Sequence, residues 1–178
     1  MIRVCLHGAE STGKSTLAEA LGARFGWPVV PEYGRTYAEE HGTDFTMDDL
    51  LAIAREQDRL MRQAAAQQPE VLLLDTDPLM TAAWAEMLFG TAPDALFGYA
   101  KAELYLLFSP DVAWIGDGTR MFGTDAERAR FAAIVEAVLV RAGVPYRSIG
   151  GDWAEREARA LDAIDSVLAG RSDAAQPR

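Results

Sequence analysis

The chain of 178 residues contains no asparagine, two histidines, and only one cysteine and two lysines. Because asparagine is missing, the chain cannot carry the Asn-Lys-x-Asp motif with which GTPase switches recognise their base. Cys5 has no second cysteine to pair with, so we expect it to lie in a strand as a small apolar residue. A chain without disulfides is typical of a reducing compartment, and we expect a cytoplasmic protein.

Long apolar runs are also missing, since no stretch approaches the ~20 residues of a membrane span. The first residues lead directly into an apolar, strand-like segment, which leaves no room for a signal peptide. We therefore expect no association with a membrane.

Basic residues are outnumbered, and the formal net charge at pH 7 is −10. A surface with this charge repels a phosphate backbone, so a nucleic-acid partner is not expected and a small-molecule substrate is favoured. The arginines are scattered along the chain, except around Arg120, Arg128 and Arg130. No residue pattern specifies an oligomeric state.

The length of 178 residues predicts one domain, and a composition of 49% hydrophobic and 25% charged residues is typical of a globular protein. We assign residues 1–170 to this domain and residues 171–178 to a flexible C-terminal tail. Neither an internal repeat nor a linker suggests a second domain.

Residues 8–15 read G-x-x-x-x-G-K-S, between an apolar segment that favours a strand and a segment that favours a helix. The glycines let the backbone turn tightly, and the loop amides and the helix N-terminus then face an anion. Lys14 can reach the β- and γ-phosphates, and the Ser15 hydroxyl can ligate Mg²⁺. The motif predicts ATP and Mg²⁺ as cofactors. The predicted nucleotide-binding residues are Gly8, Glu10, Ser11, Thr12, Gly13, Lys14, Ser15 and Thr16.

Strand-like and helix-like segments alternate along the chain. We expect strands over 2–6, 27–31, 71–74, 104–108 and 146–149. We expect helices over 16–21, 46–61 and 125–142, near 84–87 and 95–102, and after Asp152, with a loop over 111–124. This alternation predicts an α/β fold with a three-layer parallel sheet of about five strands and right-handed crossovers. The motifs then gather at the C-terminal ends of the strands.

Three acidic residues follow predicted strands. Asp75 comes after four apolar residues, as a Walker B carboxylate that holds Mg²⁺ does, although Asp75 or Asp77 can equally cap the next helix. Glu32 ends the second strand, where a carboxylate can accept a proton from an acceptor hydroxyl or bind a sugar diol. The alternative for Glu32 is a solvated loop residue. All three are candidate catalytic residues.

The arginines near the 111–124 loop are candidates for phosphate binding. Such a loop can close over the triphosphate as a mobile lid and bring a guanidinium group to the γ-phosphate. We select Arg120, which lies in the loop itself, as a catalytic and nucleotide-binding residue and add Arg128 as nucleotide-binding. One or two of the three arginines can equally be ordinary solvated charges on a helix.

Aromatic and polar residues elsewhere are weaker candidates for acceptor binding. An aromatic face suits a cationic heterocycle, although each of these side chains can also serve only the fold. His7 and His41, the latter in an expected polar loop, lack the partners of a catalytic histidine and receive no role. The predicted substrate-binding residues are Glu32, Tyr33, Arg35, Asp77, Trp84 and Trp114.

Taken together, these segments resemble the ribosylnicotinamide kinase domain of NadR-type proteins over residues 2–169. The segments that carry the resemblance are GAESTGKST at 8–16, PEYGR at 31–35, AREQ at 54–57, LDTD at 74–77, WAEMLFG at 84–90, DGTR at 117–120 and GGDW at 150–153.

The resemblance implies a P-loop nucleoside- and nucleotide-kinase-like fold with a mobile lid over 116–130. It also implies transfer of the ATP γ-phosphoryl group to the 5′-hydroxyl of nicotinamide riboside, giving nicotinamide mononucleotide. Full-length relatives add a DNA-binding segment and a nucleotidyltransferase domain. Neither is found here, so we expect a stand-alone kinase. The alternatives are a kinase for another nucleoside or small alcohol, and a regulatory ATPase module.

Overall fold

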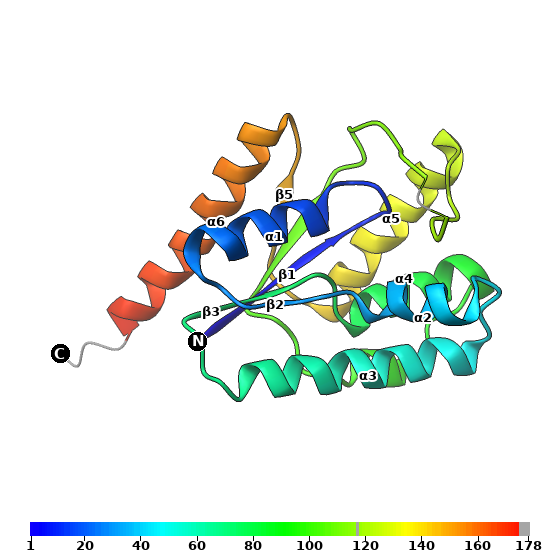
Figure 1. Ribbon diagram of the computed structural model, residues 1–178, viewed down its shortest axis with the longest axis horizontal. Coiled ribbons are helices and arrows are strands. Elements are labelled where there is room, and N and C mark those ends of the chain that lie inside the picture. The colour runs from blue at the N-terminus through cyan, green and yellow to red at the C-terminus, as the bar shows by residue number, and fades with distance from the viewer. Residues whose placement is uncertain (117, 175–178) are drawn as a thin grey trace.

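The computed structural model describes residues 1–116 and 118–174, which form one α/β domain (Figure 1). In chain order the elements are β1 (Ile2–Gly8), α1 (Lys14–Phe25), β2 (Val29–Val30), α2 (Tyr33–His41), α3 (Met47–Ala65), β3 (Val71–Leu74), α4 (Pro78–Phe89), the 3-10 helix η1 (Asp94–Phe97), β4 (Leu104–Phe108), α5 (Asp125–Ala142), β5 (Tyr146–Ile149) and α6 (Trp153–Ala174).

The strands form one five-stranded sheet in the order β2-β3-β1-β4-β5, and every pair is parallel. In this register Cys5 of β1 lies opposite Leu74 of β3 and Tyr105 of β4. Helices cover both faces, so the central strands are buried on both sides and their sequences are nearly continuous apolar runs. The predicted three-layer parallel sheet is therefore confirmed.

The sheet separates two hydrophobic cores. On one face, α1 and α6 pack against the sheet through residues such as Leu21 and Ile164. On the other face, α3, α4 and α5 pack through residues such as Leu50, Leu79 and Phe131. Figure 1 shows α1 and α6 on one side of the strands and α2, α3 and α4 on the other. Cys5 is buried in the second core, as expected.

Local sequence signals set several helix ends. Thr46 caps α3 with its hydroxyl and, in return, its backbone N–H donates to Asp49, at 2.7 Å. This reciprocal capping box satisfies two backbone donors that the helix itself leaves free. Gly143 follows the last residue of α5 and adopts a left-handed conformation with φ 65°, which glycine accepts more readily than other residues at a helix C-terminus.

The structure differs from the sequence prediction in four segments. Strand β2 is only two residues long, because prolines flank it. The helix expected near 95–102 is reduced to the short η1. Residues 33–41 form α2, so His41 ends a helix rather than lying in a loop. The sequence did not predict this helix, because it contains Gly34 and has only one buried residue, Ala38. Residues 171–174, expected in the tail, continue α6 because no proline interrupts them, while 175–178 lie outside the described residues.

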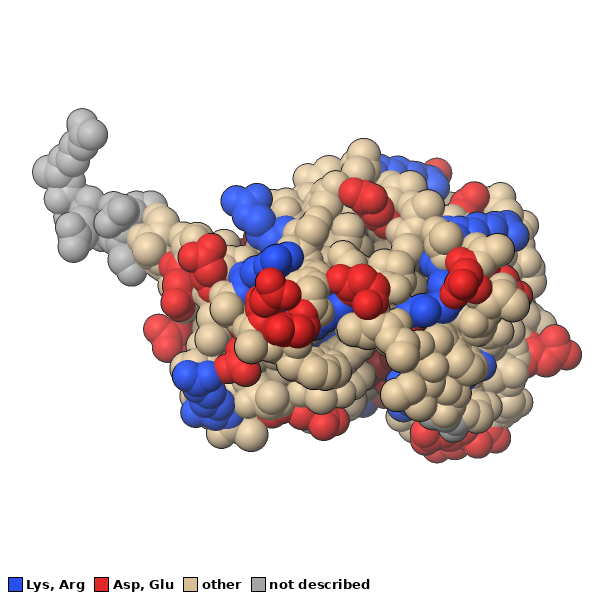
Figure 2. Space-filling model, turned by 90° about the horizontal axis from the view of Figure 1, so that it is seen from above, with Lys and Arg blue, Asp and Glu red and all other residues tan. Residues whose placement is uncertain are grey.

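Charged side chains of both signs are interspersed on the face drawn in Figure 2, and the basic residues visible there form no continuous surface. Within the described part of the chain, no helix combines the length and apolar character needed to cross a membrane.

Candidate active site

The loop between β1 and α1, together with the residues that flank it (residues 8–15), is called the phosphate loop. Both of its motif glycines are required by the geometry. Gly8 has φ 147°, and a Cβ there would lie 2.8 Å from the carbonyl oxygen of Phe108 in β4. Gly13 has φ 87°, and a Cβ there would lie 2.4 Å from Trp153 of α6. No other residue type fits at either position without moving its neighbours.

Lys14, the first residue of α1, is buried across this loop. Its Nζ donates to the carbonyl oxygens of Gly8 and Ala9, both at 2.8 Å. Burial lowers the pKa of Lys14, and the nearby carboxylates of Glu32 and Asp75 oppose that shift. The phosphate loop therefore contains a cation with acids beside it, and a cation in this position can bind the end of a polyphosphate.

Glu32 precedes α2 and lines the cavity next to the phosphate loop. Burial raises the pKa of Glu32 to about 7, against the opposing effect of Lys14. The backbone around Glu32 is held by Gln57 of α3, whose side chain accepts from the N–H of Tyr33 at 2.8 Å and donates to the carbonyl of Pro31 at 3.2 Å. A carboxyl group with this pKa can exchange protons near neutral pH.

Asp75 follows β3, and its carboxylate is suited to bind a metal ion. Its Oδ1 is buried and has no hydrogen-bond partner among the described residues. The next residue, Thr76, lines the cavity with a left-handed φ of 86°, a strained conformation that is common at functional sites. Carboxylate and hydroxyl oxygens are the donors that Mg²⁺ prefers, so Asp75 and Ser15 fit this ion.

Asp77 has a different environment from Asp75. Its Oδ1 caps α4 by accepting from the N–H of Leu79 at 3.0 Å, and its Oδ2 accepts from the hydroxyl of Tyr105 at 2.5 Å. Burial raises the pKa of Asp77 to about 6, while the hydrogen bond from Tyr105 opposes the shift. The carboxyl group of Asp77 is satisfied inside the fold, and it does not line the cavity.

The other end of the cavity is apolar and aromatic. Trp84 of α4 lines it and packs against Phe131, with ring centroids 4.9 Å apart, and against Phe122, at 5.3 Å. The apolar lining consists of Ala38, Phe45, Leu50, Ile53, Met80 and Trp84. The cavity is therefore lined both by the phosphate loop with Glu32 and by the aromatic residues Phe45 and Trp84, which we call the aromatic wall.

The loop between β4 and α5 is attached to the phosphate loop. The carboxylate of Glu10 accepts from the backbone N–H groups of Met121 and Phe122, and the Ser11 hydroxyl accepts from the N–H of Ile115 at 2.8 Å. Arg120 lines the cavity, and its guanidinium donates to Ser11 at 3.4 Å. The loop that we expect to act as a lid is thus hydrogen-bonded to the phosphate loop.

Not all of the 116–130 segment is loop. Residues 125–130 form the first turns of α5, and Asp117 lies outside the described residues. Arg128 is not part of the cavity lining, because its guanidinium donates to the carbonyls of Pro110 and Val112, at 3.1 and 2.7 Å. Trp114 also lies elsewhere, packed beside Gly116 and Gly123 of its own loop.

The structure brings most of the predicted site residues to one cavity. Those that line it are Glu10, Ser11, Thr12, Gly13, Lys14, Ser15, Thr16, Glu32, Arg35, Trp84 and Arg120. Those that do not line it are Gly8, Tyr33, Asp75, Asp77, Trp114 and Arg128. Sequence reasoning missed Gln57, Thr76 and Met80, because a polar residue within a helix, a threonine after an aspartate and an apolar helix residue are not distinctive.

The chain that forms this cavity is similar to known proteins. A protein-family model described as an AAA domain matches residues 3–156. The chain is 26% identical over 173 residues to the trifunctional NAD biosynthesis/regulator protein NadR of Escherichia coli K12, covering 93% of this chain and 42% of the relative. NadR of Salmonella typhimurium LT2 is 25% identical with the same coverage. The chain thus spans about two fifths of the length of these curated relatives.

Solved structures show the same fold. A crystal structure of NadR protein in complex with NR has a TM-score of 0.79 at 23% identity, covering 94% of this chain and 52% of that one. Deoxyadenosine kinase from M. mycoides has a TM-score of 0.67 at 10% identity, covering 93% of this chain and 100% of that one. The predicted P-loop kinase-like fold and the resemblance to NadR-type proteins are both confirmed. The chain is homologous to NadR, and because the family model spans most of it, the chain belongs to the AAA domain family.

Proposed function

We propose that this chain is an ATP-dependent small-molecule kinase that phosphorylates the 5′-hydroxyl of nicotinamide riboside to give nicotinamide mononucleotide. The observation that carries the proposal is a single cavity lined by the phosphate loop, by Glu32 and by the aromatic wall around Trp84. Phosphate donor and hydroxyl acceptor can then meet in one cavity, where positioning supplies much of the catalysis.

The phosphate loop would bind the triphosphate. Its amides and the N-terminus of α1 offer partial positive charge, and Lys14 would exchange the carbonyls of Gly8 and Ala9 for phosphate oxygens. Ser15 and Asp75 would hold Mg²⁺, which supplies charge neutralisation at the β- and γ-phosphates when it is bound. Arg120 lines the same cavity and adds a guanidinium group for the transferred phosphoryl group.

Glu32 would act as the general base. Its pKa of about 7 leaves a substantial ionised fraction at neutral pH. The carboxylate would take the proton of the acceptor hydroxyl while the oxygen forms its bond to the γ-phosphorus. The bond from that phosphorus to the bridging oxygen breaks, and ADP leaves. Gln57 holds the backbone on both sides of Glu32, which limits the movement of the base.

The aromatic wall supports a cationic acceptor. The ring in nicotinamide riboside is a pyridinium cation, which is attracted to aromatic faces such as that of Trp84 and to nearby carboxylates. The NadR protein of similar fold was crystallised with NR, which we interpret as nicotinamide riboside. That likeness supports the same acceptor here.

A coupled assay of ATP consumption across a panel of nucleosides, with nicotinamide riboside included, tests the proposal. We expect turnover that depends on nicotinamide riboside and is lost in Glu32→Gln. Preference for another nucleoside or a small alcohol would show that the proposed acceptor is wrong and that the proposed kinase activity is right. ATP hydrolysis that no nucleoside changes would overturn the kinase and favour a regulatory ATPase module.

A further inference from the structure

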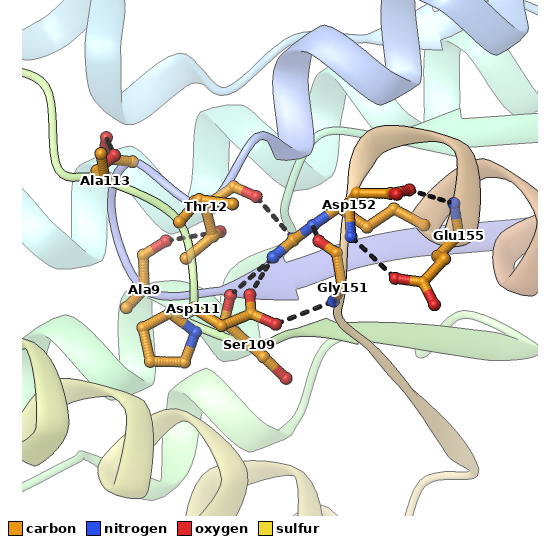
Figure 3. Close-up of polar contacts among 12 residues, drawn as sticks. Ala9, Thr12, Ser109, Asp111, Ala113, Gly151, Asp152 and Glu155 are labelled. Carbon is orange, nitrogen blue, oxygen red and sulfur yellow. Dashed lines mark hydrogen bonds and ion pairs between the residues drawn. The ribbon is translucent and has the colours of Figure 1, made fainter.

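Arg156, in the first turn of α6, is completely buried although it carries a charge. Its Nη1 donates to the carbonyl of Thr12 at 3.0 Å, and its Nε donates to the carbonyl of Gly151 at 2.8 Å. Its Nη2 pairs with the carboxylate of Asp111 and lies 3.4 Å from the carbonyl of Ser109. Figure 3 shows this network around Thr12, Asp111 and Gly151. One guanidinium group therefore joins the loops that follow β1, β4 and β5.

The contact with Thr12 affects the phosphate loop directly. In a trans peptide the carbonyl and the following N–H point in opposite directions. Holding the Thr12 carbonyl toward Arg156 therefore turns the N–H of Gly13 away from Arg156. Gly13 also lines the cavity, so the orientation of this peptide decides whether the Gly13 amide faces a bound phosphate. An anion site made of backbone amides depends on their directions.

A second side chain from the same helix face supports the same peptide. Trp153 lies three residues before Arg156, which places both on one side of α6. Trp153 occupies the space beside Gly13 where any Cβ would clash. The first turn of α6 thus contacts the phosphate loop at both Thr12 and Gly13.

The chemistry of a buried arginine indicates a role beyond packing. Burying a charged group costs free energy, and the carboxylate that pairs with Arg156, that of Asp111, is 43% exposed, so this pair alone does not explain a buried arginine. The planar guanidinium group instead offers several donors in a fixed geometry, which allows it to bind three loops at once. Lysine, a single ammonium on a flexible stem, cannot reproduce that arrangement.

We propose that Arg156 is a positioning residue for nucleotide binding, which fixes the orientation of the Thr12–Gly13 peptide in the phosphate loop. The inference rests on the proposed function, because it assumes that this loop binds a nucleoside triphosphate. Arg156 itself does not line the cavity, and so it acts through the loop.

Arg156→Lys tests the inference, with Arg159→Lys as the matched control. Arg159 lies on the same helix, is half-exposed and pairs only loosely, at 3.8 Å, with Glu155. Binding of a fluorescent ATP analogue with Mg²⁺ is titrated for each protein. We expect Arg156→Lys to raise the Kd about tenfold or more, as loss of a hydrogen bond to a charged group implies. Arg159→Lys should bind as the parent protein does.

Amide hydrogen exchange separates positioning from general destabilisation. In Arg156→Lys, peptides that cover residues 8–15 should exchange faster, while those that cover β3 and α4 should not. An unchanged Kd, or faster exchange spread equally over both cores, would overturn the inference. If Arg156→Lys does not fold, Asp111→Asn provides the test, since it removes the charge that pairs with Arg156. The same loss of affinity is then expected, and its absence would count against the proposal.

These measurements distinguish failure of the proposed kinase function from failure of the proposed role of Arg156. If the parent protein itself does not bind the analogue, the proposed kinase function is wrong. The exchange comparison still decides whether Arg156 orders the phosphate loop.

Discussion

The carboxylate of Glu10 accepts a hydrogen bond at 2.9 Å from the backbone N–H of Phe122, which lies more than a hundred residues further along the chain. Glu10 belongs to the phosphate loop, and Phe122 belongs to the loop between β4 and α5. The same carboxylate also accepts from the N–H of Met121. An acid in an anion-binding loop would repel phosphate, so its presence is explained by this attachment.

Replacing Glu10 with alanine should release the β4–α5 loop. The backbone amides of Met121 and Phe122 lose their acceptor, so peptides that cover residues 118–124 should exchange hydrogen faster. Hydrogen exchange followed by mass spectrometry measures the effect. Glu19→Ala is the control, because Glu19 is exposed on α1. Equal exchange rates in Glu10→Ala and the parent protein would show that the attachment contributes nothing.

Replacing Lys14 with alanine should cut phosphoryl transfer by a factor on the order of 10² or more, as expected when a fixed donor to the transition state is lost. The coupled ATP-consumption assay measures the rate. Circular dichroism establishes that the variant is folded. A folded variant with undiminished turnover would show that the proposed mechanism is wrong.

The proposed function also predicts a pH profile. If Glu32 is the base, its carboxylate must be ionised, and kcat/KM should rise with pH through about 7. Glu32→Gln should be nearly inactive and lack this rising limb. A profile of the parent protein that stays flat from about pH 5 to pH 8 would assign the base to another group.

Glu32 should also affect stability in a pH-dependent way. Its pKa is raised in the folded protein from 4.5 to about 7, so the folded state binds the proton more tightly than the unfolded state does. The resulting stabilisation is complete below the unfolded pKa and is lost as the pH rises through the folded pKa. Relative to the parent protein, Glu32→Gln should therefore gain thermal stability between about pH 5 and pH 8. Thermal unfolding of both proteins at these two pH values measures the difference.

Asp75 and Asp77 lie two residues apart and should respond differently to substitution. Asp75→Asn should raise the Mg²⁺ concentration for half-maximal activity by about tenfold or more, because it weakens a ligand. Asp77→Ala should lower the free energy of unfolding by about 1 to 3 kcal/mol, since α4 loses its cap and Tyr105 loses its acceptor. Magnesium titrations and urea denaturation of both variants separate these effects. If the two responses were exchanged, the assignment of metal and capping roles would be wrong.

The elements with strong local signals were predictable from sequence. The phosphate loop has fixed glycine positions, the Thr46 capping box sets the start of α3, and the apolar run before Asp75 identifies β3. Helix α2 was not predicted, because only Ala38 is buried along it and no apolar stripe forms. Its hydrogen bonds and contacts with α3 stabilise it where its sequence pattern does not.

The candidate site was predictable where a motif lies next to a strand end, as at Lys14 and Glu32. Contacts between residues far apart in the sequence could not be predicted. Gln57 is an ordinary polar residue in the sequence of a helix, and only the fold shows that its amide bonds to the backbone of Pro31 and Tyr33. Arg128 looked like a nucleotide ligand by its position, but local carbonyls already bind its guanidinium.

The sheet that separates the two cores has a consequence for how the proposed kinase could change its acceptor. The apolar cavity wall comes from α2, α3, α4 and the connection that precedes α3, all on one face, whereas α1 and α6 pack on the other. Substitutions that change which alcohol is accepted can therefore accumulate on one side of the strands. The helix that follows the phosphate loop, α1, packs on the opposite face, so such substitutions do not touch its contacts with the sheet.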